Sequence, residues 1–225
     1  MAGDPGRARP AAAVPARGRS ARLSGRGAPP VRLFVALRLP EPVRAALGAE
    51  IERLRRLAPA IAWVPPENLH VTLKFLGDVA PDRLAAVHAA LADATAEATR
   101  FDLVIEGLGA FPAPARPRVL WAGIGEGHEA LAALAGRVEA ALGAAGFAPE
   151  ARPYTGHVTL GRARAPRADP ALAAALAAAR ARRFGRVRVE RVSLMQSHLH
   201  PRGARYTELA AWGLGGSREN VDDPG

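Results

Sequence analysis

The tetrapeptide His-Val-Thr-Leu occurs twice in this chain, at residues 70–73 and again at residues 157–160. On an extended strand successive side chains point to opposite faces, so each copy places its histidine and threonine together on one face. The valine and leucine of each copy then anchor the opposite face. A half-buried strand with a structural histidine would explain a single copy. Two copies favour two similar half-domains whose histidines and threonines line one cleft.

The residue types in this repeat suit phosphate chemistry. Histidine titrates near neutral pH, so His70 and His157 can supply one acid and one base to the same reaction. The hydroxyls of Thr72 and Thr159 are hydrogen-bond donors that fit the non-bridging oxygens of a phosphate group. The repeat therefore predicts a site in which two histidines and two threonines act on a phosphate.

Composition excludes several other kinds of site. The chain has no cysteine, so neither a disulfide framework nor a thiolate metal site is possible. No apolar run approaches the roughly 18 residues that a membrane-spanning helix requires, so we expect no membrane partner. No cluster of carboxylates stands near either motif, since Asp78 follows the first motif beyond a glycine. We therefore expect no metal and no other cofactor.

The two ends of the chain differ from its middle. Residues 1–30 hold six arginines against one acidic residue, among mostly Ala, Gly and Pro, which predicts a disordered basic leader. A leader of this kind could contact RNA phosphates, but we favour a passive tail. It lacks the continuous apolar centre of a secretory signal, and we expect a cytoplasmic protein. Residues 31–214 are expected to form one domain with two similar lobes, and residues 215–225 a flexible tail.

Strands and helices alternate between these ends. The hydrophobic periodicity predicts strands at 31–37, 62–64, 69–76, 101–107, 118–124, 154–162, 187–194 and 205–211, and helices at 42–57, from Pro81 to about residue 91, at 131–142 and at 170–183. Two sets of such elements, each containing one motif, indicate an α+β fold with two lobes.

Four blocks of sequence resemble the two-histidine phosphoesterases, and within them the RNA 2′,3′-cyclic phosphodiesterases, also called 2′-5′ RNA ligase-like proteins. The resemblance covers essentially residues 31–214. The blocks are VRLFVALRLP at 31–40, WVPPENLHVTLKFLG at 63–77, GHVTLGR at 156–162 and SHLHPRGARY at 197–206. The ordered set is far more specific than either tetrapeptide alone.

The resemblance implies a bilobal, pseudo-symmetric α+β fold, in which two antiparallel sheets form a central cleft and helices lie outside. It implies hydrolysis of RNA 2′,3′-cyclic phosphate ends to a 2′-phosphomonoester by a monomer, with RNA or nucleotides carrying that phosphate as substrate. His70 would be the general acid at O3′ and His157 the general base that activates water. Thr72 and Thr159 would hold the phosphate oxygens.

Arg162 corresponds to a basic position of this family, five residues after the second histidine, where it would bind the phosphate. Strict alternation along a strand places Arg162 on the face opposite His157, because five is odd. It can reach the phosphate only if the strand bends or bulges, and Gly161 makes a bulge plausible.

Other side chains near the motifs are weaker candidates. Lys74 has the parity to share the face of His70 and Thr72, although a solvated strand lysine is equally consistent. Aromatic residues could stack on a base; the candidates are Phe34, Trp63, Phe111 and Tyr154.

Three functions are consistent with the sequence. The leading one is hydrolysis of the cyclic phosphate. The second is reversible 2′-5′ RNA ligation by the related transesterification. The third is a non-catalytic RNA-binding module, which the intact histidines argue against, because a binder needs phosphate donors but no paired acid and base.

Overall fold

The computed structural model describes residues 28–165, 167–200, 203–215 and 218–219. The described strands are β1 (Val31–Arg38), β2 (Ala62–Trp63), β3 (His70–Val79), β4 (Phe101–Phe111), β5 (Val119–Ile124), β6 (His157–Arg162), β7 (Arg183–Val189), β8 (Arg191–His198), β9 (Arg205–Gly213) and β10 (Arg218–Glu219). The helices are α1 (Glu41–Leu57), α2 (Leu84–Ala96), α3 (His128–Ala144) and α4 (Pro170–Ala178). Both motif strands, β3 and β6, begin at their histidine.

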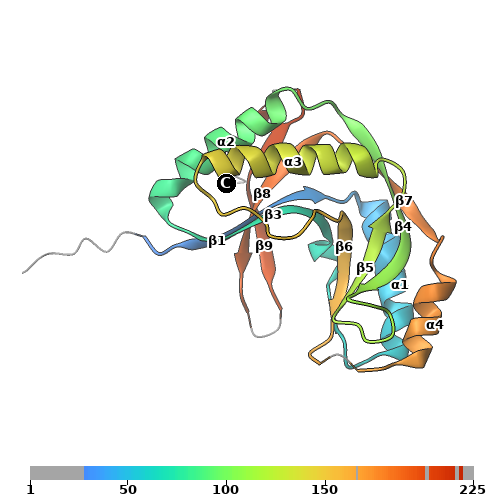
Figure 1. The fold of residues 1–225 in the computed structure, drawn as a ribbon. Helices are drawn as coiled ribbons and strands as arrows, with labels where there is room; N and C mark the ends of the chain where they lie inside the picture. Colours follow the sequence, from blue (N-terminus) through green and yellow to red (C-terminus); the bar gives the residue numbers. More distant parts are fainter. Residues whose placement is uncertain (1–27, 166, 201–202, 216–217, 220–225) are drawn as a thin grey trace, which may run out of the picture.

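The strands form a curled antiparallel sheet in the order β10-β9-β8-β1-β3-β6-β5-β4-β7, with β2 paired to β6. The two motif strands meet in the middle of this order, and their register has one residue pair, Val71 opposite Val158. Figure 1 shows how the sheet curls on either side of this junction. The expected α+β fold with two antiparallel lobes is confirmed, and the two sheets are joined edge to edge at the motif strands.

The helices lie outside the curled sheet (Figure 1). Helices α2 and α3 pack against each other, and they contact β9 and β3. Helices α1 and α4 contact each other, and they pack on β7 and β4 respectively. Because α1 follows β1 in the chain but packs on β7, it ties the first half of the sheet to the second.

A continuous apolar core lies beneath the motif strands. Val71, Val158 and Leu160 are each 0% exposed, and Leu73 is also buried. These residues are the valines and leucines of the two tetrapeptides, so their predicted role as anchors is confirmed. A separate small cluster of Phe34, Ala36 and Met195 packs with Tyr206.

Two elements differ most from the sequence-based expectation. Residues 187–194 form parts of two strands, because β7 pairs with β4 whereas β8 pairs with β1 and β9. The change of partner occurs at Glu190, where no glycine or proline marks it. The helix predicted to reach residue 183 ends at Ala178, because the segment from Arg183 pairs with β4 despite the high helix propensity of the alanine-rich run before it.

The chain ends are only partly described. Residues 1–27 of the expected basic leader lie outside the described residues. Within the expected flexible tail, β10 pairs with β9, through Arg218 opposite Trp212 and Glu219 opposite Ala211. The domain boundaries at residues 31 and 214 stay predictions. Among the described helices, none is long and apolar enough to cross a membrane.

Candidate active site

The junction between β3 and β6 brings the two motifs together. The strands are antiparallel with Val71 opposite Val158, so His70 lies beside Thr159 and Thr72 lies beside His157. Both valines are buried in the core. Since side chains alternate, the histidines and threonines project from the other face. The structure therefore places the four predicted residues in one cluster at the centre of the sheet.

Each motif strand carries a β-bulge at its leucine. In β6, Thr159 pairs with Trp121 and Gly161 pairs with Leu120, so Leu160 is the extra residue. The bulge reverses the alternation for the residues that follow. Arg162 therefore returns to the face of His157, and the two side chains line the same hollow. The bulge that the position of Arg162 requires is present.

The same bulge in β3 explains why Lys74 is not where the alternation predicts. Thr72 pairs with Ala36 and Lys74 pairs with Val35, which leaves Leu73 as the extra residue. Lys74 is 4% exposed, and its Nζ donates to Glu139 Oε2 at 2.7 Å and to the Ala148 carbonyl at 2.9 Å. The ammonium group is thus bound to α3 and the loop after it, so the expectation that Lys74 shares the face of His70 is wrong.

Phe75 takes the place that Lys74 was expected to hold. It follows His70 by five residues, as Arg162 follows His157, and the two bulges turn both side chains to the open face. Phe75 is 59% exposed and lines the same hollow as His157 and Arg162. Phe75 was not among the predicted site residues, because a bulge was expected after the second motif only.

Both histidine rings are fixed in the same way. The Nδ1 of His70 lies 2.7 Å from the Asn68 carbonyl, and the Nδ1 of His157 lies 2.8 Å from the Thr155 carbonyl. A carbonyl oxygen only accepts hydrogen bonds, so Nδ1 carries the proton in each ring. Nε2 is then the nitrogen that can accept a proton when the ring is neutral or donate one when it is charged.

Electrostatics lower the pKa of both histidines. Burial is the main cause for His70, and the charges of His157 and Arg162 add to it, against the hydrogen bond to Asn68. Burial also lowers the pKa of His157, again with the charge of Arg162 and against the bond to Thr155. A positive charge on His157 therefore disfavours protonation of His70.

His157 lines the main hollow of this face, a space of about 700 Å³. Thr72, Phe75 and Phe111 also line it, and the Phe111 ring lies 5.2 Å from the His157 ring. Its arginines are Arg118, Arg152 and Arg162, and Lys74 and Glu150 also line it. A hollow with aromatic surfaces and positive charges suits a nucleotide.

Tyr154 supports the wall of the main hollow. Its hydroxyl donates to the carbonyl of Thr72 at 3.0 Å. Burial raises the pKa of Tyr154, so the hydroxyl keeps the proton that this bond requires. Tyr154 thus connects the segment before β6 to the first motif.

His70 lines a separate, smaller hollow of about 310 Å³. Its ring lies 4.9 Å from the Phe34 ring and 5.4 Å from the Tyr206 ring. Asn68 holds the neighbouring loop by donating to the Ala204 carbonyl at 2.7 Å. Ala204 and Tyr206 of the final sequence block therefore lie beside the segment that carries Asn68 and His70.

Comparison with known proteins agrees with this geometry. The family model described as the 2′-5′ RNA ligase superfamily matches residues 40–201, which is more than half of the chain. The chain belongs to this superfamily. It is 35% identical over 184 residues to the RNA 2′,3′-cyclic phosphodiesterase of Methanothermobacter thermautotrophicus, covering 82% of this chain and 99% of that protein.

Solved structures of similar proteins share the fold. A crystal structure of a Thermus thermophilus protein aligns with a TM-score of 0.68 and 31% identity, covering 83% of this chain and 100% of that one. Escherichia coli LigT in complex with 3′-AMP aligns with a TM-score of 0.65 and 28% identity, covering 82% of this chain and 98% of that one. The bilobal arrangement is therefore that of known phosphoesterases.

This member of the 2′-5′ RNA ligase superfamily keeps both motifs in full. Gly156 directly precedes the second histidine, and a Cβ there would lie 2.5 Å from Leu131 Cδ2. The local packing thus leaves no room for a larger residue unless Leu131 moves. Within the described residues, no group of three or more His, Asp or Glu side chains could hold a metal ion.

Proposed function

We propose that this protein hydrolyses the 2′,3′-cyclic phosphate ends of RNA to 2′-phosphomonoesters by metal-independent acid and base catalysis. The observation that carries the proposal is the antiparallel junction of the two motifs, which puts His70 and His157 on one face with Nε2 of each available. Several relatives in the superfamily, including that of Methanothermobacter thermautotrophicus, are named RNA 2′,3′-cyclic phosphodiesterases.

The proposed step requires one proton to be removed and another to be supplied. Water attacks phosphorus while His157 takes its proton, the bond from phosphorus to O3′ breaks, and His70 gives a proton to O3′. Thr72 and Thr159 donate hydrogen bonds to the non-bridging oxygens, and Arg162 offsets the charge that develops on them. The assignment of His70 as acid and His157 as base stays a prediction, which the leaving-group dependence of the rate can decide.

The main hollow offers a place for the nucleoside next to the reacting phosphate. Phe75 presents an exposed aromatic face in this hollow, on which a base can stack. Tyr154, Phe34 and Trp63 are less suited to stacking, since the first two pack around the site and Trp63 Nε1 donates to the Ala58 carbonyl. The similarity to a LigT structure that contains 3′-AMP supports a nucleotide as the ligand of this chain.

The same groups would serve the alternative reaction. In 2′-5′ ligation the 5′-hydroxyl of a second RNA takes the place of water, and the family model carries this activity in its description. The two reactions differ in their products, a 2′-phosphomonoester against a longer strand. That the enzyme is a cytoplasmic monomer stays a prediction.

The test is incubation of the full chain with 2′,3′-cyclic AMP and with an oligoribonucleotide that ends in a 2′,3′-cyclic phosphate, each with and without EDTA. We expect release of the 2′-phosphomonoester, identified by chromatography against both isomers, at the same rate in the chelator. The His157→Gln variant is the control for a contaminating nuclease. Binding without turnover, or activity that EDTA abolishes and a divalent ion restores, would overturn the proposal.

A further inference from the structure

Two segments of the chain are rich in arginine and free of acidic residues. Residues 107–125 and 151–168 contain neither Asp nor Glu. They contain six arginines, which we call the arginine track: Arg116, Arg118, Arg152, Arg162, Arg164 and Arg167. All six are exposed.

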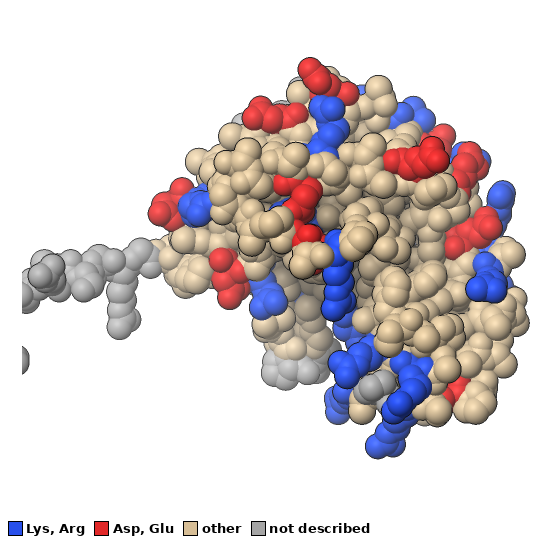
Figure 2. Space-filling view, in the orientation of Figure 1, with Lys and Arg blue, Asp and Glu red and all other residues tan. Residues whose placement is uncertain are grey.

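The two segments lie side by side. Val119 pairs with Arg162 between β5 and β6, and the Ala163 amide donates to the Arg118 carbonyl at 2.9 Å. Arg118 is therefore flanked by Arg162 and Arg164 on the neighbouring segment. Figure 2 shows basic side chains gathered in the lower part of the molecule, around the ends of β5 and β6 and the segment before α4.

The arginine track leads away from the reacting groups. Three members, Arg118, Arg152 and Arg162, line the main hollow beside His157. Two others, Arg164 and Arg167, line a second hollow of about 670 Å³ between the end of α1 and the start of α4. The positive charge is thus continuous from the proposed phosphate site to the surface beyond it.

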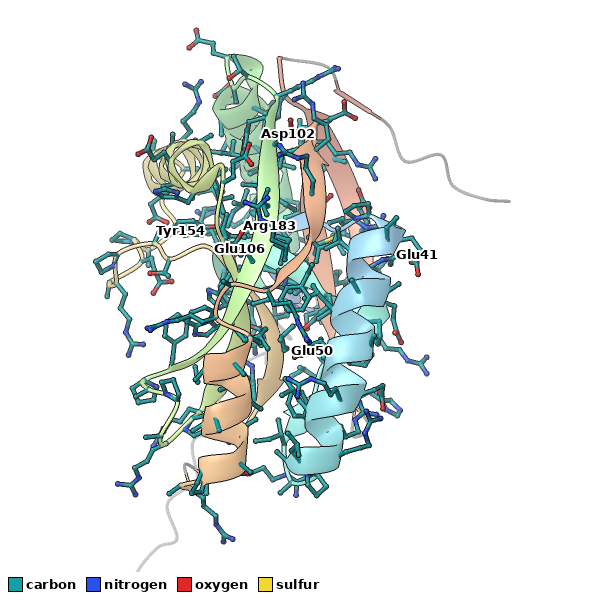
Figure 3. All side chains as sticks on the ribbon, turned by 90° about the vertical axis from the view of Figure 1, so that its right-hand side faces the viewer. Glu41, Glu50, Asp102, Glu106, Tyr154 and Arg183 are labelled. Atoms are coloured by element: carbon teal, nitrogen blue, oxygen red, sulfur yellow. The ribbon has the colours of Figure 1, made fainter. Side chains whose placement is uncertain are left out.

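The arginines of the track are not used in ion pairs. Among the described residues, no carboxylate lies within ion-pair distance of any of the six, whereas Arg183, Arg186 and Arg188 on β7 are paired with Glu106, Glu126 and Asp102. Figure 3 shows Arg183 beside Glu106 on the outward strands β4 and β7, with Asp102 farther along β4. The arginines of the track therefore differ from those of β7 in having no carboxylate partner among the described residues.

Six adjacent positive charges without partners repel one another, which opposes folding unless a polyanion binds them. Guanidinium groups bind phosphate oxygens in a bidentate manner, so a row of them fits a nucleotide backbone better than it fits a single small anion. A 2′,3′-cyclic phosphate stands at the 3′ end of its strand, so the rest of the RNA must leave the site on its 5′ side. The track provides a path for that strand.

We propose that the arginine track binds the single-stranded RNA on the 5′ side of the reacting nucleotide, so that oligonucleotide ends are preferred over free cyclic nucleotides. This inference rests on the proposed function, and it adds a binding surface outside the catalytic cluster. Arg116, Arg164 and Arg167 lie beyond the main hollow and contact only the strand.

The experiment compares two triple variants of the full chain. Arg116→Ala/Arg164→Ala/Arg167→Ala removes three charges from the track, and Arg183→Ala/Arg186→Ala/Arg188→Ala removes three charges from β7 as the matched control. Each is assayed with 2′,3′-cyclic AMP and with a short unstructured oligoribonucleotide ending in a 2′,3′-cyclic phosphate, over a range of salt concentrations. Circular dichroism confirms that both variants are folded.

We expect the track variant to lose oligonucleotide kcat/KM while it keeps its rate on cyclic AMP. Losing three phosphate contacts on a single strand should make the slope of log kcat/KM against log salt concentration shallower by about 2. When the salt concentration rises fourfold, kcat/KM of the parent should therefore fall about 20-fold more than that of the variant. The control variant should behave like the parent. Equal losses on both substrates, or no loss on the oligonucleotide, would refute the track, whereas a parent that turns over neither substrate would refute the proposed function instead.

Discussion

Replacing Lys74, the only lysine in the chain, should destabilise the protein by a predictable amount. Its side chain is 2% exposed, and it joins β3 to Glu139 on α3 and to the Ala148 carbonyl. Lys74→Met keeps the aliphatic stem but removes both charged hydrogen bonds. Glu139 is 32% exposed and keeps its bond from the Glu150 amide, so water can replace part of what it loses. We expect a loss of about 1–3 kcal/mol in the free energy of unfolding.

Glu139→Gln should cost more than Lys74→Met. It leaves the buried ammonium group without a counter-charge, which costs about 3–5 kcal/mol for a buried ion pair that loses one partner. Combining the two changes removes the uncompensated charge, so the double variant should be close to Lys74→Met alone. Urea unfolding followed by circular dichroism gives the three values. A Glu139→Gln protein that is more stable than Lys74→Met, or a double variant whose loss equals the sum, would refute this reasoning.

The pH dependence of the free energy of unfolding of these variants is a second test of the same ion pair. Burial would raise the pKa of Glu139, but the bonds from Lys74 and the Glu150 amide hold it below its ordinary value of 4.5. A carboxyl with a lowered pKa contributes stability above that ordinary value, and the contribution is lost as the pH falls through the lowered pKa. In Lys74→Met this acid-side loss of stability should become smaller.

Two further predictions concern the proposed catalytic groups. His70→Ala and His157→Ala should each lower the rate by about 10²–10⁴, and the double variant should be little worse than either. The leaving group of a p-nitrophenyl phosphodiester needs no proton. On that substrate the variant that lacks the acid should therefore lose less activity than the variant that lacks the base. A plot of the rate against pH should be bell-shaped. Arg162→Gln should move both the acidic and the basic side of this curve to higher pH, because it removes a charge that lowers the pKa of both histidines. The first expectation is contradicted if both histidine variants lose equal activity on the p-nitrophenyl phosphodiester. The second is contradicted if the pH–rate profile of Arg162→Gln coincides with that of the parent.

The central cluster could be predicted because it depends on local periodicity. The repeat fixes which residues alternate on each strand, and the burial of Val71 and Val158 confirms it. The positions of Lys74 and Phe75 could not be obtained in this way, because an extra residue in a strand depends on the partner strand opposite it. The repeat itself was a usable signal. Arg162 requires a bulge after the second copy, so a bulge was also to be expected after the first copy.

The arrangement of the remaining strands depended on longer-range pairing. Residues 187–194 read as one apolar strand, but their two parts pair with opposite halves of the sheet. The hydrogen-bond partner of a strand is not encoded in its own alternation. The support that Tyr154 gives to Thr72 was equally hidden, because their contact joins positions 82 residues apart in the chain.

The junction of β3 and β6 also bears on how the two halves of the sheet are held together. A ladder with one residue pair contributes few hydrogen bonds, so contacts elsewhere must help to hold the halves in place. These contacts are the packing of α1 on β7, the bond from Lys74 to Glu139 and the bond from Tyr154 to the Thr72 carbonyl. The two histidines lie directly beside the single pair of valines. Their spacing therefore depends on these contacts as well as on the strands that carry them.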